Sequence, residues 1–343
     1  MASFKQLQPS DFVISSDSVS GTLWSTGNPT LSTFYTSSTQ AASSAGDYYL
    51  SVYQTGSGES NAAIQFDIAY ANADGSGSLL FDSAVNGQSP TRSLYGQYRN
   101  LVLEDENAQF VFGGVTQSDF YVLNFERAQY KQELFLGSFN LRLTGSAANR
   151  QLDLTDNSQE TTVVQYNGAG RVYQLISGSN GEADTQLNTN GYTTAQGSYG
   201  LLLPDIGVAL LNAAALDLPT GEGVDLATER NSNTDDNNNA KLFAVVGGGG
   251  SGSFGLNSQE TISSDFIFVR AQNQEFNYSE NPSFISGSSG EVIFQSFINN
   301  PQTYATTVGL YNNTNDLVAV AKLSRPLEKD FTKETLVRIK LDF

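Results

Sequence analysis

The sequence predicts a mainly β protein, with antiparallel sheets in sandwich-like domains, one or two short helices and long loops. Charged residues make up only 15% of the 343 residues, so the polar character comes from Ser, Thr, Asn, Gln and Gly, which suits short strands joined by turns. Many segments alternate apolar and polar residues with the period of a half-buried strand. Aromatic residues make up a further 11%, enough for a packed core.

Residues 1–45 are predicted to form an extended N-terminal arm. This segment is rich in Ser and Thr and has few apolar runs. Short strands are expected at 12–14 and 30–35. An arm of this kind is suited to reaching over a neighbouring subunit.

Residues 46–200 are predicted to form a β-rich domain with one helix near 90–103. A turn at 56–58 joins the first two strands into a hairpin. Ser89 is placed to cap the helix and Pro90 to occupy its first turn, and the acidic run 104–106 should end it. Four apolar residues follow at helical spacing: Leu94, Tyr98, Leu101 and Val102. The expected strands are 48–53, 63–70, 110–112, 120–125, 134–136, 139–143, 161–166 and 171–176.

Residues 201–260 combine the most apolar stretch of the chain with polar loops. Pro204 and Gly207 interrupt 201–216, so we expect a buried strand followed by a turn or short helix. The acidic segment 219–240 is expected to be an exposed loop, and 241–246 a helical turn. The Gly-rich run 247–253 is expected to be flexible.

Residues 261–343 are predicted to form a C-terminal β domain. Strands are expected at 266–270, 292–294, 306–311, 317–323 and 336–343. The turn 312–316 predicts a hairpin, and Ser324, Arg325 and Pro326 predict a break after it. The last strand alternates apolar and charged residues, so its apolar face should need cover.

The chain contains no histidine and no cysteine. This excludes the Ser-His-Asp and Cys-His nucleophilic schemes, ordinary zinc sites and disulfides. The chemistry left is that of carboxylates, lysine and tyrosine, and a carboxylate-dependent glycan hydrolase stays open. We therefore predict a non-enzymatic protein with no catalytic residues.

The net charge of −18 argues against nucleic acid or an anionic membrane as the main partner. The charge is uneven, because residues 322–343 hold six bases and four acids. This segment is either a docking surface for an acidic neighbour or a strand with a basic polar face. No apolar run reaches the length of a membrane helix, and residues 1–7 lack the pattern of a secretory signal, so synthesis in a cytoplasm is expected.

Two kinds of segment resemble ligand sites and are better interpreted as loops. The glycine run has no phosphate-loop lysine after it. The acidic clusters at 104–106, at Asp153, Asp156 and Glu160, and at 235–236 have no recognised calcium spacing, and 72–78 is a plain turn. No cofactor and no metal are predicted.

The candidate interface residues are aromatic side chains of the arm and basic side chains of the C-terminal segment, together with the terminal aromatic ring. They are Trp24, Phe34, Tyr35, Lys322, Arg325, Lys329, Lys333, Arg338, Lys340 and Phe343.

Segments 308–313, 316–326 and 331–343 resemble the end of virion structural proteins of T-even-like myophages that infect marine cyanobacteria. The segments 275–283 and 95–103 are similar to the same group. The resemblance implies a structural subunit of the virion, assembled in the host cytoplasm. The contractile tail or its baseplate is the favoured position, and the neck and the capsid surface stay open. The resemblance also implies contacts with other virion proteins and with further copies of the chain, and no enzymatic activity.

Strand addition is the expected mode of assembly, through the arm and the C-terminal strand. A glycan- or receptor-binding module on the virion surface is the alternative. That alternative would place exposed Tyr and Trp together over a β face.

Overall fold

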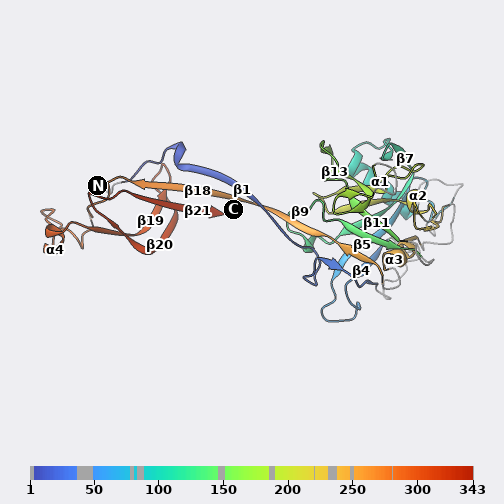
Figure 1. The fold of residues 1–343 in the computed structure, drawn as a ribbon, viewed down its shortest axis with the longest axis horizontal. Helices are drawn as coiled ribbons and strands as arrows, with labels where there is room; N and C mark the ends of the chain where they lie inside the picture. The colour runs from blue at the N-terminus through green and yellow to red at the C-terminus, as the bar shows by residue number, and fades with distance from the viewer. Residues whose placement is uncertain are drawn as a thin grey trace. The chain divides into compact units, whose positions relative to one another are not determined.

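The computed structural model describes residues 4–36, 49–77, 81–82, 89–145, 151–184, 190–219, 221–230, 238–247, 251–279 and 281–342. They form two compact units (Figure 1): unit 1 comprises residues 1–18 and 261–343, and unit 2 comprises residues 19–260. The predicted arm therefore contributes to both units. Segments 46–200 and 201–260 belong to one unit, because strands from both enter the same sheet.

The mainly β fold is confirmed. The elements within unit 2 are β2 (Thr30–Leu31), β3 (Tyr35–Thr36), β4 (Leu50–Tyr53), β5 (Ile64–Asn72), α1 (Pro90–Leu103), β6 (Phe110–Phe112), β7 (Val115–Gln117), β8 (Asp119–Phe125), the 3-10 turn Arg127–Gln129, β9 (Glu133–Leu134), β10 (Asn140–Thr144), β11 (Gln151–Asp156), β12 (Gln165–Asn167), β13 (Gly170–Ser179), β14 (Glu182–Ala183), β15 (Gly200–Leu203), β16 (Val208–Asn212), α2 (Ala213–Leu216), α3 (Asn238–Gly247) and β17 (Ser253–Gly255).

Two strands, β1 (Phe12–Thr22) and β18 (Asn257–Ala271), run across the boundary between the units along the chain. The elements within unit 1 are the 3-10 turn Pro9–Asp11, α4 (Gln295–Asn299), β19 (Thr303–Tyr311), β20 (Leu317–Lys329) and β21 (Thr335–Asp342).

Unit 2 is built on one large curled sheet. Its strand order is β2-β17-β10-β11-β13-β15-β16-β8-β5-β4-β3, with β12 and β14 paired to β13, and the pairings are antiparallel. The β4–β5 hairpin predicted across 56–58 is present. The order mixes strands that are distant in sequence, so tertiary contacts set the sheet.

The concave face of this sheet closes on an aromatic cluster. Phe254 lies on β17 near one end of the strand order and Phe66 on β5 near the other, yet their ring centroids are 5.6 Å apart. The Trp24 ring lies 5.1 Å from Phe254 and also contacts Phe66 and Phe125. The cluster therefore joins strands from both ends of the sheet.

The middle strands are buried on both faces. On β8, Tyr121 and Leu123 enter the concave core, while Phe120 and Val122 enter a second core. Helix α1 and the β6–β7 hairpin contribute side chains to this second core, for example Tyr95 of α1. Burial on both faces explains why the apolar runs in this part of the chain are nearly continuous.

Helix α1 begins at Pro90 as predicted and ends at Leu103, followed by Glu104 in the left-handed conformation. Ser89 occupies the N-cap position, but its side chain makes no capping bond. The Ser89 hydroxyl instead donates to the Gly75 carbonyl oxygen at 2.6 Å, and so ties the start of the helix to the turn after β5.

Four local predictions for unit 2 need correction. The acidic segment 219–240, expected as an exposed loop, buries Val224 and Leu226 in the core. The stretch 201–216 forms two strands, β15 and β16, and then α2, because Gly207 takes a left-handed turn conformation that reverses the chain. The expected helical turn at 241–246 is a full helix, α3. The strand predicted at 161–166 forms only at β12.

Unit 1 contains two small sheets. Strands β1, β18 and β21 form one of them, with Ile267 opposite Ile339 in the β18–β21 ladder. The predicted hairpin is confirmed as β19–β20, but β20 continues past Pro326 to Lys329, with a register shift that accommodates the break. The strand predicted at 292–294 is reduced to an isolated bridge between Val292 and Ile285, because α4 begins directly after Phe294.

We predict that Trp24→Ala destabilises unit 2 by about 3–5 kcal/mol, because it leaves a large cavity where both ends of the sheet meet. Guanidinium unfolding followed by far-ultraviolet circular dichroism would measure the change. The matched control is Leu101→Ala on the exposed side of α1, expected within about 0.5 kcal/mol of the parent. Equal losses of unfolding free energy in the two variants would show that the aromatic cluster does not stabilise unit 2 more than an exposed residue does.

Candidate functional site

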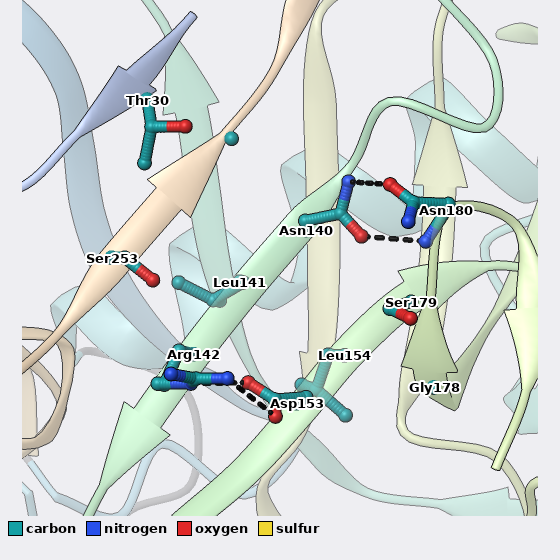
Figure 2. A pocket seen from close by; sticks show the side chains of 11 residues that line it. Thr30, Asn140, Leu141, Arg142, Asp153, Leu154, Gly178, Ser179, Asn180 and Ser253 are labelled. Carbon is teal, nitrogen blue, oxygen red and sulfur yellow. Dashed lines mark hydrogen bonds and ion pairs between the residues drawn. The ribbon is translucent and has the colours of Figure 1, made fainter.

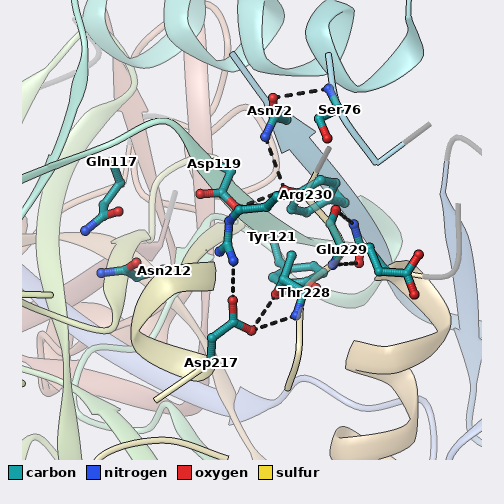
Figure 3. A network of polar contacts seen from close by, with 12 residues as sticks. Asn72, Ser76, Gln117, Asp119, Tyr121, Asn212, Asp217, Thr228, Glu229 and Arg230 are labelled. Atoms are coloured by element: carbon teal, nitrogen blue, oxygen red, sulfur yellow. Dashed lines mark hydrogen bonds and ion pairs between the residues drawn. The ribbon is translucent and has the colours of Figure 1, made fainter. Parts of the chain in front are cut away.

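One buried polar network in unit 2 joins two acids through an arginine (Figure 3). Arg230 Nε donates to Asp119 Oδ2 at 2.7 Å, and its Nη1 pairs with Asp217. The Tyr70 hydroxyl donates to the same Asp119 oxygen at 2.8 Å. In a hydrolase with two carboxylates, substrate or water would lie between the acids. Here the guanidinium occupies that space.

The same network fixes the segment before residue 231 to the core. Asp217 Oδ1 accepts from both the backbone N and the hydroxyl of Thr228 at 2.8 Å, and that hydroxyl lies 3.0 Å from the Tyr121 hydroxyl. Burial raises the pKa values of Tyr70 and Tyr121 far above their ordinary range. Burial also raises the pKa of Asp119, although Arg230 favours its charged form. These contacts give the network a structural role.

A second ion-pair cluster joins Arg171 to Asp205 and Glu133. Asp205 accepts from Arg171 Nε at 3.0 Å and from the Arg171 backbone N at 2.8 Å. Burial opposes ionisation of Asp205, but the hydrogen bonds from Arg171 outweigh it and hold the pKa of this carboxyl below its usual value. A side chain at Gly170 (φ +100°) would collide with Asp205, so the cluster requires glycine there.

The outer face of the sheet has a shallow polar hollow of about 380 Å³, lined by β2, β10, β11, β13 and β17 (Figure 2). Arg142 and Asp153 form a two-bond ion pair across it, at 2.7 and 3.1 Å. Asn140 and Asn180 exchange hydrogen bonds beside them. These polar groups bond to one another, and none of the described residues that line the hollow is aromatic.

The acidic clusters considered as calcium sites do not meet at a common site where the structure describes them. In the described part of the chain, no three acidic side chains are grouped closely enough to hold a metal ion. Asp156 instead accepts from backbone N of Gly137 and Ser158. The pair 235–236 lies outside the described residues. No described helix has both the length and the apolar character needed to cross a bilayer.

Unit 1 differs from unit 2 in having almost no apolar core. Ile267 and Ile339, 6% and 5% exposed, are the only buried apolar side chains among its described residues. By contrast, 16 of the 24 exposed large apolar side chains described for the chain belong to unit 1. They are Phe4, Phe12, Val13, Ile14, Phe276, Tyr278, Ile293, Phe294, Ile298, Tyr304, Tyr311, Leu317, Val318, Val320, Phe331 and Leu336.

The aromatic candidates from the arm lie in unit 2. Trp24 is only 2% exposed and is enclosed by its own chain. Phe34 is half-buried against the same core. Tyr35, on edge strand β3, is exposed. Of the three, Tyr35 has the most accessible side chain.

The basic candidates on β20 and after it are placed differently from one another. Lys329 is buried, and its Nζ donates to Asn277 Oδ1 and to the carbonyls of Asn273 and Asp330 at 2.8 to 3.0 Å. Lys333 pairs with Glu328 at 2.7 Å. Both lysines therefore hold unit 1 together internally.

The other basic candidates are exposed. Arg338 and Lys340 flank the Phe266 ring on the β18–β21 sheet, at 5.6 and 5.9 Å from its centroid. Lys322 and Arg325 project from β20 without an ion-pair partner among the described residues. Phe343 lies outside the described residues.

Residue patterns could have indicated the open surface of unit 1. The run Val318–Ala321 is apolar at consecutive positions, so β20 presents apolar side chains on both faces. A strand of that kind needs cover on both sides. The ion pair of Asp119 with Arg230, in contrast, joins residues 111 positions apart and leaves no local signal.

No family model, no curated protein and no solved structure matches this chain.

We predict that Arg230→Met destabilises unit 2 by about 3–5 kcal/mol, because Asp119 stays buried without its counter-ion. Denaturant unfolding followed by Trp24 fluorescence would measure this. Arg142→Met removes an exposed pair and should cost less than about 1 kcal/mol. Adding Asp119→Asn to Arg230→Met should recover part of the loss, and no recovery would contradict an electrostatic cause.

A further prediction concerns pH. Burial raises the pKa of Asp67, which accepts a 2.7 Å bond from Ser51 and lies near Glu126. The folded state therefore binds this proton more tightly than the unfolded chain, whose value is near 3.8. The contribution of Asp67 to the free energy of unfolding should therefore rise as the pH falls from neutral towards 3.8, the pKa of the unfolded chain. Asp67→Asn should reduce the rise in unfolding temperature between pH 7.5 and pH 5, and an unchanged rise would exclude Asp67 as a source.

Proposed function

We propose that the chain is a non-enzymatic structural subunit of a bacteriophage virion, located in the contractile tail or its baseplate. In this proposal unit 1 is the part through which copies assemble, and unit 2 is a self-sufficient folded body. The observation that carries the proposal is the missing core of unit 1. The resemblance of 308–343 to virion proteins supports the same conclusion.

Two buried apolar side chains, Ile267 and Ile339, contribute little to the folding free energy of unit 1. Ordering β19, β20 and β21 costs conformational entropy at every residue, and burial of apolar surface is the main term that offsets it. Ile267 and Ile339 supply very little of that burial. Large exposed apolar areas of this kind mark interaction sites. Assembly would bury them and complete the unit.

The distribution of charge agrees with assembly through unit 1. Unit 1 has eight basic and eleven acidic residues, a net charge of −3, whereas unit 2 has nine basic and 24 acidic residues, a net charge of −15. Repulsion between copies is therefore concentrated in unit 2. Unit 1 is close to neutral and apolar, and can meet other copies at low electrostatic cost.

The alternative, a glycan- or receptor-binding module, has less support. Stacking on sugars needs exposed aromatic faces, and Trp24 is enclosed. The hollow on the outer sheet has its polar groups paired internally. Binding on a glycan array would favour this alternative.

We predict that the purified full-length chain forms a defined oligomer at micromolar concentration, measured by native mass spectrometry and light scattering. In the virion, mass spectrometry of separated tails and heads should find the chain in the tail fraction. A chain that stays monomeric at all concentrations, or that hydrolyses host envelope polysaccharide, would contradict the proposal.

A further inference from the structure

Lys329 and Asn277 form a buried pair in unit 1, 3% and 5% exposed. Lys329 Nζ donates to Asn277 Oδ1 at 2.8 Å, and to the carbonyl oxygens of Asn273 and Asp330 at 2.9 and 3.0 Å. Lysine is almost never fully buried unless it is paired, yet no carboxylate among the described residues forms an ion pair with this one. We propose that the two side chains join in an intramolecular isopeptide bond between Lys329 Nζ and Asn277 Cγ.

The geometry places the reacting atoms close together. A carbonyl bond is about 1.2 Å long, so Asn277 Cγ lies no more than about 4 Å from Lys329 Nζ. The Asn273 carbonyl oxygen accepts from Lys329 Nζ at 2.9 Å and also from Asn277 Nδ2 at 2.6 Å. The attacking nitrogen and the leaving nitrogen therefore lie side by side around one acceptor, and a short approach brings Nζ to the carbonyl carbon.

The backbone on both sides of the pair is fixed by Thr303. This residue begins β19 and is the ladder partner of Lys329 at the end of β20. The Thr303 hydroxyl donates to the Phe276 carbonyl oxygen at 2.8 Å and lies 3.4 Å from the Lys329 carbonyl oxygen. Thr303 thus holds the residue before Asn277 next to the backbone of Lys329. Such fixed placement of two reacting groups removes much of the entropic barrier to their reaction.

The step exchanges one amide for another and needs no oxidant or reductant. The deprotonated Lys329 amine attacks Asn277 Cγ and forms a C–N bond, and the bond from Cγ to Nδ2 breaks. In all, the lysine ammonium gives up two protons, the leaving nitrogen gains two, and ammonium ion is released. The chain loses one molecule of ammonia and the charge of Lys329. It gains a cross-link between residues 52 positions apart.

Glu275 is the carboxylate placed to carry these protons. Its Oε2 accepts from Lys5 Nζ at 2.7 Å and from the Gln272 backbone N at 2.8 Å. The hydrogen bond from Lys5 is the main cause that lowers the pKa of Glu275, and the charge of Lys329 contributes to the same shift. The carboxylate is therefore ionised and near the reacting lysine. It can take a proton from Nζ and pass it to the leaving nitrogen.

A covalent bond at this place would compensate for the small core of unit 1. It would join the segment after β18 to the end of β20. Folded units with small cores are commonly stabilised by cross-links, which restrict the unfolded chain. The inference does not depend on the proposed function, because the bond forms within one chain.

Intact mass spectrometry of the purified full-length chain under denaturing conditions tests the bond directly. After allowance for removal of Met1, the chain should be lighter than its sequence mass by one ammonia molecule, about 17 Da. Trypsin should release a branched peptide in which residues 271–322 are joined to residues 323–333, because it no longer cleaves after acylated Lys329. The full sequence mass would overturn the inference. Loss of ammonia without the branched peptide, as from a succinimide at an Asn-Gly sequence, would overturn it as well.

Variants of the two lysines locate the bond. Lys329→Arg keeps a positive charge but has no amine that can form the amide, so it should retain the full sequence mass. Lys333→Arg is the matched control, because Lys333 pairs with Glu328 and takes no part in the reaction. It should lose ammonia as the parent does. A branched peptide at Asn277 in Lys329→Arg would contradict the assignment of the nucleophile.

The rate of linkage tests the proton carrier while both reacting side chains stay in place. In Glu275→Gln the linked fraction, followed by mass at intervals after purification, should grow at least about tenfold more slowly than in the parent. Glu328→Gln, which changes a carboxylate that pairs with Lys333, is the control and should link at the parental rate. An unchanged rate in Glu275→Gln would exclude Glu275 from the step.

Discussion

The packing of Trp24 between the two ends of the curled sheet is the contact on which unit 2 depends. A sheet of many short strands has two edges and a concave face that water would otherwise fill. Phe254 and Phe66 belong to strands far apart in the sheet order, and the Trp24 ring joins them. Once this side is closed, α1 can cover the other face of the middle strands through Tyr95. The ion pairs of Arg230 and Arg171 then fix loops to an already closed body.

Unit 1 has strands of comparable or greater length, but its described residues form no equivalent of this cluster. Its aromatic rings lie apart on the surface or in small groups, such as Phe284 with Tyr278 and Phe297. Its buried lysine, Lys329, is satisfied by carbonyl and amide oxygens, so it ties a turn to β20 without creating an apolar interior. Within one chain, unit 2 thus has a closed apolar core, whereas the described part of unit 1 buries only two apolar side chains.

Local signals in the sequence predicted local structure well. Helix α1 follows from Pro90 and helical spacing, and the β19–β20 hairpin follows from its Asn-rich turn. Features that depend on distant residues were not predictable. The burial of Trp24 depends on Phe254, 230 positions away, and a Ser/Thr-rich context suggested an arm. For 201–216 the sequence predicts one buried strand and then a turn or short helix, because burial on both faces removes the alternation that would separate β15 from β16. The apolar run Val318–Ala321 indicates an uncovered strand, but the small core of unit 1 as a whole becomes evident only from the contacts of the folded chain.

An exposed edge strand can pair with strands of other chains and so cause aggregation. The geometry of the β19–β20 hairpin limits such pairing. Edge strands add further strands most readily when they are flat and regular. The hairpin has register shifts at Ala305/Thr307 and at Leu310/Tyr311, and such irregularities bend a strand and interrupt its ladder. Edge-to-edge addition to β19 or β20 is therefore disfavoured, while the face bearing Val318 and Val320 stays open. The irregularities thus interrupt the ladder of the hairpin and leave its apolar face as the accessible surface.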